Sequence, residues 1–469
     1  MRWMADLFYL AAAILFLPFL AYDLLVLKKN RQGWRERFGS VRRSDPSRPA
    51  IWIHAVSLGE VNAVRTLVTS LRECLPRFSV VVSSTTDTGT ARAAELFGKE
   101  NVFRFPLDFS VVISRVLNRI QPRMIILLEL EVWYNLVRMA HARAVPVAVV
   151  NGRITARSER RLSYIKPFAR SMFRRLSWVG AQDETIADRF RRLGVPQERV
   201  EVTSSLKWDT AEVADRVSGQ SELSAAMGLD GSRFLWVCGS TGAEEESLIL
   251  EAYQRLRERW SERVSGLTGH SRRDQHNHPP VLFLVPRKPE RFDSVAAEIQ
   301  RTGFECVRRS QRRDRVSGAP LRESAVLLGD TTGELRMGYA LADVVFIGRS
   351  LVPQGGSDPI EAAALGKPLI VGPHMENFES AVEAFRGVDA LRVVASAAEL
   401  ADTVADFCCN LESARAMGQR GQRTVVDRKG ATRRTMARIV EILERAEWAS
   451  AEFPNRTDSG LRKEQPCRT

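Results

Sequence analysis

The amino-acid sequence predicts an α/β protein with two doubly wound parallel sheets and a separate apolar segment at the N-terminus. Short apolar runs alternate with helical stretches of about 12 to 25 residues, which is the pattern of repeated strand–helix–strand units. The alternation stops in the polar segment 209–233 and then restarts, and a chain of 469 residues is long enough for two or three domains. The remaining observation is the almost uninterrupted apolar run from Leu7 to Leu27.

The N-terminal run is long enough to act as a membrane anchor. Leu7 to Leu27 contain one charged residue, Asp23, and about 20 apolar residues span a bilayer as a helix. Seven Lys and Arg against one Glu follow between Lys28 and Arg43, as expected for a cytoplasmic flank. We therefore expect an uncleaved anchor over residues 1–30, with the rest of the chain on the cytoplasmic side beside anionic lipids. A cleaved signal or a core helix is the alternative, and Pro18 leaves open whether the segment crosses the bilayer fully.

The chain carries an excess of positive charge, with 69 Lys and Arg against 56 Asp and Glu. Such an excess indicates anionic partners, namely a nucleotide, a nucleic acid or a membrane surface. The basic stretch 151–175 has eight Arg and Lys against one Glu but matches no nucleic-acid-binding module, so lipid headgroups suit it better. Six cysteines without CxxC spacing favour a reducing compartment and argue against a zinc site.

We assign residues 31–215 to a first domain and residues 216–448 to a second domain. The predicted strands of both are near-continuous apolar runs, because parallel strands are buried on both faces. Two similar α/β domains place a ligand cleft between them, at the carboxyl ends of the strands. The predicted strands are IWIHAV, SVVVSST, NVFRFP, RMIILLEL, VPVAVVNG and LSWVGAQ in the first domain, and RFLWVCGS, VLFLVPR, GFECVRRS, AVLLGD, DVVFIGRS and KPLIVGP in the second.

Three polar stretches fall outside this pattern. Residues 265–280 and 310–322 are predicted to be solvated loops, and residues 449–469 a disordered tail. The histidines of the first loop could bind a metal ion, but no acidic or cysteine ligand lies near them in the sequence. We therefore predict no metal site.

A carboxylate stands where the first buried strand gives way to a helix. In IWIHAVSLGEVNAV, residues 51–64, Gly59 allows a tight turn, and Glu60 falls in the first helical turn. The N–H groups of that turn and the helix dipole stabilise an anion there. Glu60 is therefore a candidate catalytic carboxylate, and the alternative is a helix cap that does no chemistry.

Further charged residues follow other strands of the first domain. LELEVW, residues 128–133, places Glu129 and Glu131 on one side at the end of a strand. Lys207, in TSSLKWDT, lies just before the polar segment. Together with Glu60 they supply carboxylates and one ammonium group to the predicted cleft. A structural ion pair between a glutamate and Lys207 is the alternative.

The second domain has its densest set of Gly-rich turns between Gly329 and Phe378. In GGSDPIE, Asp358 suits a helix N-cap and Pro359 suits the first helical position. Backbone N–H groups at such a start can hold a phosphate, and Glu361 in the first turn could bind ribose hydroxyls. The alternative is a helix cap without a ligand.

Two other segments of the second domain could face a ligand. Arg287, in LVPRKPERF, follows a buried strand and lies between two prolines, where its guanidinium can grip a phosphate or carboxylate. CGSTGAEEES, residues 238–247, ends a strand with hydroxyls and glycines. It is not a GxGxxG pattern, and no acidic residue ends a second strand about 20 residues on, which argues against a dinucleotide oxidoreductase.

The ordered motifs HAVSLGE, ELEVW, NGRI, SSLKWD, VPRKPERF, DTTGEL, ADVVFIGRSLVPQGG, DPIEAAALGKP and GPHMENF resemble the 3-deoxy-D-manno-octulosonic acid (Kdo) transferases of lipopolysaccharide assembly. The resemblance implies a GT-B glycosyltransferase fold, with a Rossmann-like acceptor-binding domain followed by a Rossmann-like domain that binds the CMP-sugar. It also implies transfer of Kdo from CMP-Kdo to a lipid A precursor at the cytoplasmic face of the inner membrane. CMP-Kdo is then a substrate, and no cofactor is expected.

The resemblance implies roles for individual residues. Glu60 matches the general base of the family. Glu129 and Lys207 match positions that assist the transition state, with Glu131 as a rival to Glu129. Three segments match those that bind CMP, namely Pro286 and Arg287; Thr332, Gly333 and Glu334; and Asp358, Pro359, Ile360 and Glu361.

Three residues depart from the family pattern. Lys288 stands where the family has histidine, and Ser357 and Asp358 replace histidine and asparagine. Asp358 would repel a nucleotide phosphate unless it only caps the helix, and Lys288 offers a compensating charge. The departures concern donor contacts rather than the reaction class. The alternatives are a membrane-anchored GT-B transferase that moves another nucleotide-activated sugar to an anionic lipid, and a binding scaffold without activity.

Overall fold

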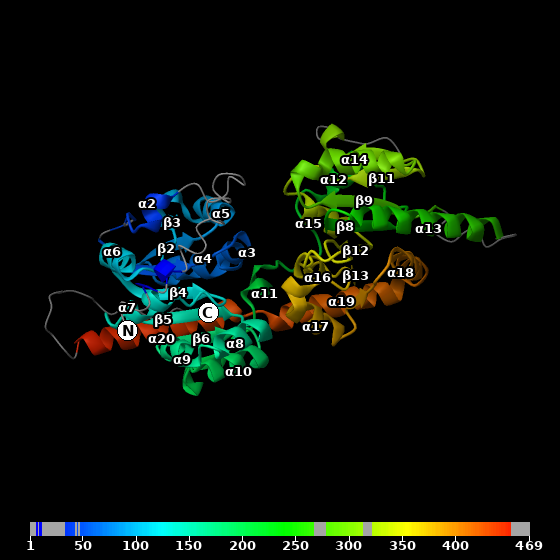
Figure 1. The fold of residues 1–469 in the computed structure, drawn as a ribbon. Helices are drawn as coiled ribbons and strands as arrows, with labels where there is room; N and C mark the ends of the chain where they lie inside the picture. Colours follow the sequence, from blue (N-terminus) through cyan, green and yellow to red (C-terminus); the bar gives the residue numbers. More distant parts are fainter. Residues whose placement is uncertain are drawn as a thin grey trace. The chain divides into compact units, whose positions relative to one another are not determined.

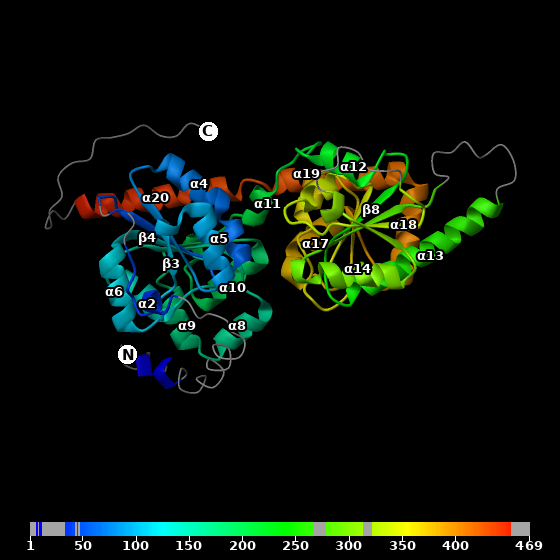
Figure 2. The ribbon, with the colours of Figure 1, turned by 90° about the horizontal axis from the view of Figure 1, so that it is seen from above.

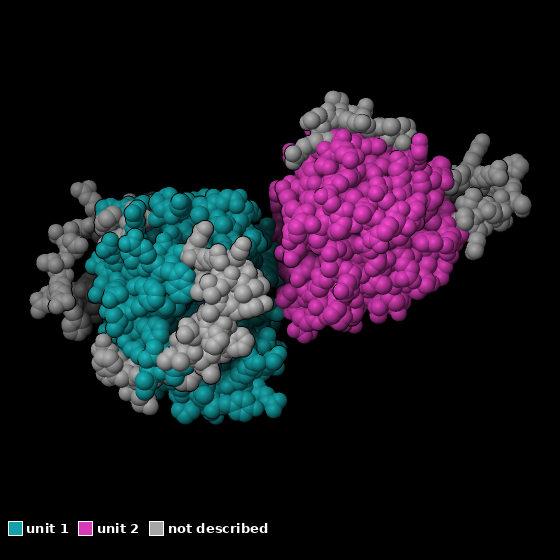
Figure 3. Space-filling model, turned by 45° about the horizontal axis from the view of Figure 1, so that its top comes forward, with its two compact units in different colours: residues 1–210, 429–469 teal, residues 211–428 magenta. Residues whose placement is uncertain are grey.

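The computed structural model describes residues 6, 7, 9–11, 33–42, 45, 47–266, 278–312 and 321–451. The chain divides into two compact units (Figure 3). Unit 1 consists of residues 1–210 and 429–469, and unit 2 consists of residues 211–428. Each unit is built around a seven-stranded parallel sheet, as the alternating apolar runs predict.

The sheet of unit 1 has the strand order β3-β2-β1-β4-β5-β6-β7 (Figure 1). All neighbouring strands pair in parallel, and β1 is fully buried along its length. The six predicted strands are present, and a seventh, β7, lies at one edge. The strands are β1 (Ala50–His54), β2 (Ser79–Ser84), β3 (Val102–Arg104), β4 (Pro122–Leu128), β5 (Val147–Gly152), β6 (Trp178–Ala181) and β7 (Val200–Val202).

Helices cover both faces of this sheet, which explains the continuous apolar runs. Along β1, Trp52 points into one core, whereas Ile51 and Ile53 point into the other. The helices of unit 1 are α2 (Trp34–Arg37), α3 (Leu58–Ala63), α4 (Arg65–Cys74), α5 (Asp87–Phe97), α6 (Ser110–Ile120), α7 (Tyr134–His141), α8 (Ala156–Ser163), α9 (Lys166–Phe173), α10 (Glu184–Leu193), α11 (Leu206–Thr210) and α20 (Ala431–Ala451).

The sheet of unit 2 has the order β10-β11-β9-β8-β12-β13-β14, again with parallel pairs throughout. Its strands are β8 (Leu235–Thr241), β9 (Val281–Pro286), β10 (Glu305–Arg308), β11 (Ala325–Leu328), β12 (Val344–Ile347), β13 (Leu369–Val371) and β14 (Leu391–Val393). Its helices are α12 (Gln220–Met227), α13 (Glu245–Gly266), α14 (Phe292–Arg301), α15 (Leu335–Leu341), α16 (Ile360–Ala364), α17 (Glu379–Arg386), α18 (Ala397–Cys409) and α19 (Leu411–Arg428).

The C-terminal helix α20 returns to unit 1, which corrects the predicted second domain of 216–448. Residues 429–448 belong to unit 1, because Ile439 and Leu443 complete the core that Ile51 and Ile53 enter. Figure 2 shows α20 running along α4, and the two helices are in contact. Residues 211–215, assigned above to the first domain, belong to unit 2.

Several predicted segments lie mostly outside the described residues. Of the predicted anchor, 1–30, only residues 6, 7 and 9–11 are described, and the Asp6 carboxylate accepts hydrogen bonds from Ser110 N (2.9 Å) and Asn135 Nδ2 (3.0 Å). Within the described residues, no helix combines the length and apolar character needed to cross a bilayer. Residues 449–451 of the predicted disordered tail, 449–469, are instead the end of helix α20. The rest of that tail and most of the two predicted loops lie outside the described ranges.

Candidate active site

The topology of unit 1 brings two of the predicted segments together. From β1 the chain proceeds to β2 on one side, whereas β4 lies on the other side of β1. Ligands of open α/β sheets bind at such a switch point, outside the carboxyl ends of the strands. Glu60 follows β1, and Glu129 and Glu131 follow β4. The switch point therefore carries three of the four predicted catalytic residues.

Glu60 caps its own helix. Ser57 is the N-cap of α3, and its hydroxyl accepts a hydrogen bond from the Glu60 N–H at 3.4 Å. In return, the Glu60 carboxylate accepts hydrogen bonds from the Ser57 hydroxyl (3.0 Å) and from Val56 N (2.8 Å). This is a variant of the capping box, in which a Ser and a Glu three residues on bond reciprocally. Glu60 therefore does cap the helix, as the alternative interpretation expects. Whether it can also act as a catalytic base depends on the pKa of its carboxylate.

Burial and neighbouring charge raise the pKa of Glu60 to about 7. Burial is the main cause, and the negative charges of Glu129 and Glu131 add to it. A general base works best with a pKa near the operating pH. The environment of Glu60 therefore suits proton transfer near neutral pH, and the same carboxylate also caps α3.

Glu129 and Glu131 form the other part of what we call the glutamate cluster, defined as Glu60, Glu129 and Glu131. Glu129 has a left-handed backbone conformation (φ 52°), which is uncommon for a residue other than glycine and is typical of functional sites. The Glu131 carboxylate accepts a hydrogen bond from Trp133 Nε1 at 3.1 Å, and burial raises its pKa. The negative charge of Glu129 contributes to the raised pKa of Glu131, after burial.

Lys207 lies on α11, and this short helix contacts α3, which carries Glu60. The side chain is half-buried. Asn151, at the end of β5, fixes the start of α11, because its side-chain oxygen accepts hydrogen bonds from Leu206 N (3.1 Å) and Ser205 Oγ (3.2 Å). The predicted ammonium group is therefore held on the element beside the glutamate cluster.

The coupling within the cluster gives a pH-dependence prediction. We expect kcat/KM to fall as the pH drops below about 7, because protonated Glu60 cannot accept a proton. Replacing Glu129 with glutamine removes a negative charge that raises the pKa of Glu60, so this acidic limb should move to lower pH. The pH profile of kcat/KM for wild type and E129Q measures both. An unmoved limb in E129Q would show that Glu60 is not the titrating group.

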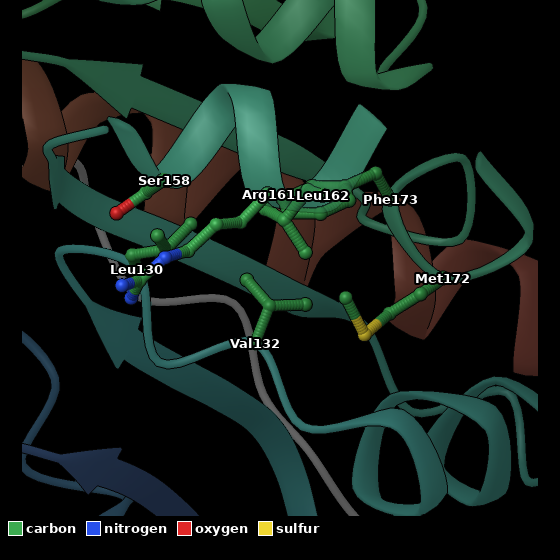
Figure 4. A pocket seen from close by; sticks show the side chains of 7 residues that line it. All are labelled: Leu130, Val132, Ser158, Arg161, Leu162, Met172 and Phe173. Carbon is green, nitrogen blue, oxygen red and sulfur yellow. The ribbon is translucent and has the colours of Figure 1, made fainter. Parts of the chain in front are cut away.

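Unit 1 also contains a pocket of about 270 Å³ beside the glutamate cluster (Figure 4). Leu130 and Val132, which flank Glu131, form one wall, and α8 and α9 supply the others. Most of its lining side chains are apolar, and Arg161 is its charged residue. The lining residues are Leu130, Val132, Ser158, Arg161, Leu162, Met172 and Phe173.

Unit 2 has its own switch point between β8 and β12, and a pocket of about 370 Å³ lies there. We call it the cationic pocket, because four of its lining residues are basic. Arg287 is among them, and its N–H donates to Thr241 O at 3.1 Å, which joins the ends of β9 and β8. The lining residues are Thr241, Gly242, Ala243, Arg287, Lys288, Arg291, Arg349 and Gln354.

Gly242 leaves room in the wall of the cationic pocket for the Gln354 side chain. A Cβ on Gly242 would lie 2.1 Å from Gln354 Oε1, so a larger residue would displace that side chain. Thr241 and Gly242 belong to the CGSTGAEEES segment that the sequence predicts to face a ligand, and both line the pocket.

The segment 358–361 lies near Arg287, since Arg287, Asp358 and Glu361 all act electrostatically on the buried hydroxyl of Tyr339. Asp358 does bond to the helix start, with its carboxylate accepting from Ile360 N at 2.9 Å, but α16 begins at Ile360 rather than at Pro359. Burial, and then the charge of Asp358, raise the pKa of Glu361. No hydrogen bond to the Glu361 side chain comes from any described residue, which leaves its oxygens available to a ligand.

In the segment 332–334, which was expected to bind CMP, the Glu334 side chain is already occupied by other residues. The Glu334 carboxylate is engaged by Arg309, with Nε at 3.0 Å and Nη2 at 2.9 Å, and by the Thr331 hydroxyl. Thr332 and Gly333 are exposed. A ligand at this segment would therefore meet Thr332 and Gly333 rather than a free Glu334 carboxylate.

The unusual residues of the donor motifs have separate roles. Ser357 is buried, and its hydroxyl donates to Ser240 O at 3.2 Å, which ties the loop before α16 to the end of β8. Lys288 is mostly exposed at the pocket and lies 3.7 Å from the Glu290 carboxylate. It is thus an exposed positive charge at the edge of the pocket.

Two residues of unit 2 escaped the sequence-based prediction. Glu245 is fully buried, and its carboxylate accepts hydrogen bonds from four backbone N–H groups, those of Gly242, Arg349, Ser350 and Leu351. Arg349 lines the pocket from a left-handed backbone conformation (φ 62°). A run of three glutamates at a helix start indicates a solvated turn, so no sequence signal marks Glu245 as buried. Within the described residues, no group of His, Cys, Asp and Glu is arranged to hold a metal ion.

Two Rossmann-like units, each with polar residues at the switch point of its sheet, define the architecture of GT-B glycosyltransferases. A solved structure named as a glycosyltransferase from Rickettsia africae has the same fold, with a TM-score of 0.54 and 12% identity over 84% of this chain and 99% of that chain. Residues 32–210 match the family model described as 3-deoxy-D-manno-octulosonic-acid transferase (kdotransferase).

The chain belongs to the 3-deoxy-D-manno-octulosonic acid transferase family and is a glycosyltransferase. The transferase of that name from Haemophilus influenzae is 32% identical over 419 residues, which cover 88% of this chain and 92% of the relative. The one from Bordetella pertussis is 36% identical over 414 residues, covering 85% of this chain and 89% of the relative.

Proposed function

We propose that this enzyme transfers Kdo from CMP-Kdo to a lipid A precursor in lipopolysaccharide assembly, with inversion at the anomeric carbon. The observation that carries the proposal is Glu60, a carboxylate at the unit 1 switch point whose pKa lies at about 7. Membership of the Kdo transferase family supports the sugar. We propose that CMP-Kdo is consumed as a substrate and that the reaction needs no cofactor.

In the proposed reaction, Glu60 accepts the proton of a glucosamine hydroxyl on the lipid acceptor. The hydroxyl oxygen forms a bond to the anomeric carbon of Kdo from one face, while the bond from that carbon to the phosphate oxygen breaks on the other. CMP leaves with the bonding electron pair, and the proton stays on Glu60 until solvent removes it. General-base assistance of this kind contributes about 10² to 10⁴-fold to the rate.

The other residues of the glutamate cluster have supporting roles in the proposal. Glu129 and Glu131 keep the pKa of Glu60 high enough for it to act as a base. Lys207 supplies positive charge that favours the negatively charged transition state. Leu130 and Val132, the chain neighbours of Glu131, line the unit 1 pocket, so the pocket adjoins the segment that carries Glu131.

We propose that unit 2 binds CMP-Kdo. Arg287, following Pro286 at the end of β9, would contact the phosphate, since a guanidinium binds a phosphate with two parallel hydrogen bonds. The half-buried Glu361 carboxylate, which accepts no hydrogen bond from any described residue, suits ribose hydroxyls. Thr332 and Gly333 would contribute exposed backbone, and Asp358 to Ile360 would shape the turn.

The unit 1 pocket supports an acylated and phosphorylated acceptor, because its walls are apolar and Arg161 can pair with a phosphate. We expect R161A to raise the KM for the lipid acceptor about 10-fold while leaving the KM for CMP-Kdo unchanged. The matched control is R157A, which removes an exposed arginine of the same helix α8 that does not line the pocket. Equal effects of both variants on acceptor KM would contradict a specific contact and indicate general charge attraction.

We further propose that the enzyme acts at the cytoplasmic face of the inner membrane, held by its N-terminal segment. The connection between α8 and α9 supports a membrane-facing surface, because Tyr164 and Ile165 are 73% and 49% exposed there. These two side chains stand within the basic stretch 151–175, and basic segments with exposed apolar tips suit an anionic lipid surface.

The experiment that tests the proposed function is mass spectrometry of a diphosphorylated, acylated lipid A precursor after incubation with CMP-Kdo and the detergent-solubilised enzyme. A mass gain of one or more Kdo units is the expected result, and it also counts the sugars added. An unchanged acceptor, with folded protein and intact CMP-Kdo, would overturn the proposed donor or acceptor. Assays with UDP- and GDP-sugars would then identify another activated sugar.

A further inference from the structure

The cationic pocket of unit 2 holds more positive charge than the surrounding carboxylates balance. Arg291 is neutralised by the buried Glu246, with Nη2 at 2.8 Å from Oε2, and Lys288 lies 3.7 Å from Glu290. Within the described residues, no carboxylate oxygen lies within 4.0 Å of the guanidinium of Arg287 or Arg349. Two arginines thus face this pocket without an ion pair to any described carboxylate, and a pocket of this kind favours a ligand with two anionic groups.

The backbone around Arg349 is held in place. Its N–H donates to the buried Glu245 carboxylate at 2.5 Å, and its carbonyl accepts from Gly356 N at 2.8 Å. Its guanidinium donates to Gln354 O through Nη2 at 2.6 Å, which leaves its other donors for a ligand. Arg349 keeps a left-handed backbone that glycine would adopt more readily, and strain of this sort persists where function requires the side chain.

The two arginines line the same pocket but have different side-chain neighbours. Arg287 acts on the Tyr339 hydroxyl together with Asp358 and Glu361, which are the residues proposed to meet the nucleotide. Arg349 lies instead against Gly242 and Gln354, since its Cγ would be 3.0 Å from a Cβ on Gly242. Arg287 is therefore placed with the nucleotide-binding residues, and Arg349 is placed with the turn that follows β8.

We infer that Arg349 recognises the carboxylate of the transferred sugar, while Arg287 recognises the phosphate of the nucleotide. The inference rests on the proposed function, because CMP-Kdo carries one phosphodiester and one sugar carboxylate. A planar guanidinium binds a carboxylate in a bidentate manner, which distinguishes an acidic sugar from a neutral sugar of similar size. Arg349 is then a specificity-determining residue that selects donors with an acidic sugar.

Replacing Arg349 with glycine tests the inference with little risk to the fold, because glycine suits the left-handed backbone. Binding of CMP and of CMP-Kdo to the full-length, detergent-solubilised enzyme is measured by calorimetry without acceptor. We expect R349G to weaken CMP-Kdo binding about 10-fold and to leave CMP binding unchanged, because CMP lacks the sugar carboxylate. R349K keeps the positive charge but not the planar guanidinium, so its affinity for CMP-Kdo should lie between those of wild type and R349G. R287M should weaken the binding of both CMP and CMP-Kdo.

The control is R301M, which removes an exposed arginine at the end of α14 outside the pocket and should bind both ligands normally. The inference is overturned if R349G binds CMP-Kdo as wild type does, or if it loses CMP and CMP-Kdo affinity equally. Failure of the proposed function is a separate result. It appears as a wild-type enzyme that yields no Kdo-modified lipid, whereas the calorimetry compares ligands without any turnover.

Discussion

Replacing Glu60 with glutamine is expected to lower kcat by about 10² to 10⁴-fold, which is the contribution of general-base catalysis. Glutamine has the same shape and can still accept the hydrogen bond of Val56 N, so the start of α3 should remain intact. It cannot take a proton from the acceptor hydroxyl. Steady-state kinetics with saturating CMP-Kdo and acceptor measure the loss, and calorimetry should find CMP binding unchanged, because the residues proposed to bind CMP lie in unit 2.

The matched control for this variant is S57A. It removes the hydroxyl that caps α3 but leaves the Glu60 carboxylate, and loss of an N-cap costs about 1 kcal/mol of stability. S57A should therefore be less stable and still turn over, whereas E60Q should be folded and inactive. Near-normal turnover in E60Q, together with lost stability in S57A, would mean that this pair only caps the helix.

The raised pKa of Glu60 also has a consequence for stability. The folded state holds this proton up to about pH 7, whereas the unfolded chain releases it near pH 4.5. The stabilising contribution of this proton to the free energy of unfolding is therefore fully present below pH 4.5 and is lost as the pH rises through 7. E60Q removes this dependence, so its melting temperature relative to wild type should be higher at pH 8 than at pH 5. The carboxylate thus lowers stability at the pH where it is useful, as functional residues often do.

Replacing Glu245 with alanine is expected to destabilise unit 2 by about 3 kcal/mol or more. The carboxylate accepts hydrogen bonds from the backbone N–H groups of Arg349, Ser350 and Leu351, and each buried donor left without a partner costs about 1–3 kcal/mol. Thermal and urea unfolding of the full-length protein measure the loss.

The variants E244A and E245Q make the Glu245 result specific. Glu244 is exposed and adjacent, so E244A should leave stability within about 0.5 kcal/mol of wild type. E245Q keeps one acceptor oxygen, so its free energy of unfolding should lie between those of E245A and wild type. If E245A unfolded like wild type, water would have to replace the carboxylate, and the loop carrying Arg349 would not depend on it.

The apolar pattern predicted twelve of the strands, most of which are buried on both faces, and every one of those runs contains a strand. The two that it missed, β7 and β14, are three-residue edge strands with partly exposed side chains. An edge strand of this length needs no apolar run, because its neighbour supplies the hydrogen bonds. The sequence also did not predict that α20 packs on unit 1. The pattern of an amphipathic helix shows which face is apolar, but it does not show which sheet that face covers.

The residues of the candidate site, like the strands, were predictable from the sequence only in part. Glu60, Glu129 and Arg287 were predictable, because a polar residue directly after a buried strand must lie at the carboxyl edge of the sheet. The engagement of Glu334 by Arg309 and the burial of Glu245 were not, because both depend on side chains far apart in the sequence. The left-handed backbone of Arg349 likewise has no signature in a sequence that places arginine there.

The return of α20 sets an order of events during synthesis of the chain. The core of unit 1 is complete only when Ile439 and Leu443 are in place, and these residues leave the ribosome after all of unit 2. At about 5–20 residues per second, some 10 to 50 seconds separate the emergence of residue 210 from that of α20. Throughout that interval the nascent first unit exposes the apolar surface that α20 will cover, while unit 2 can already fold. The first unit to be translated is thus the last to complete its core.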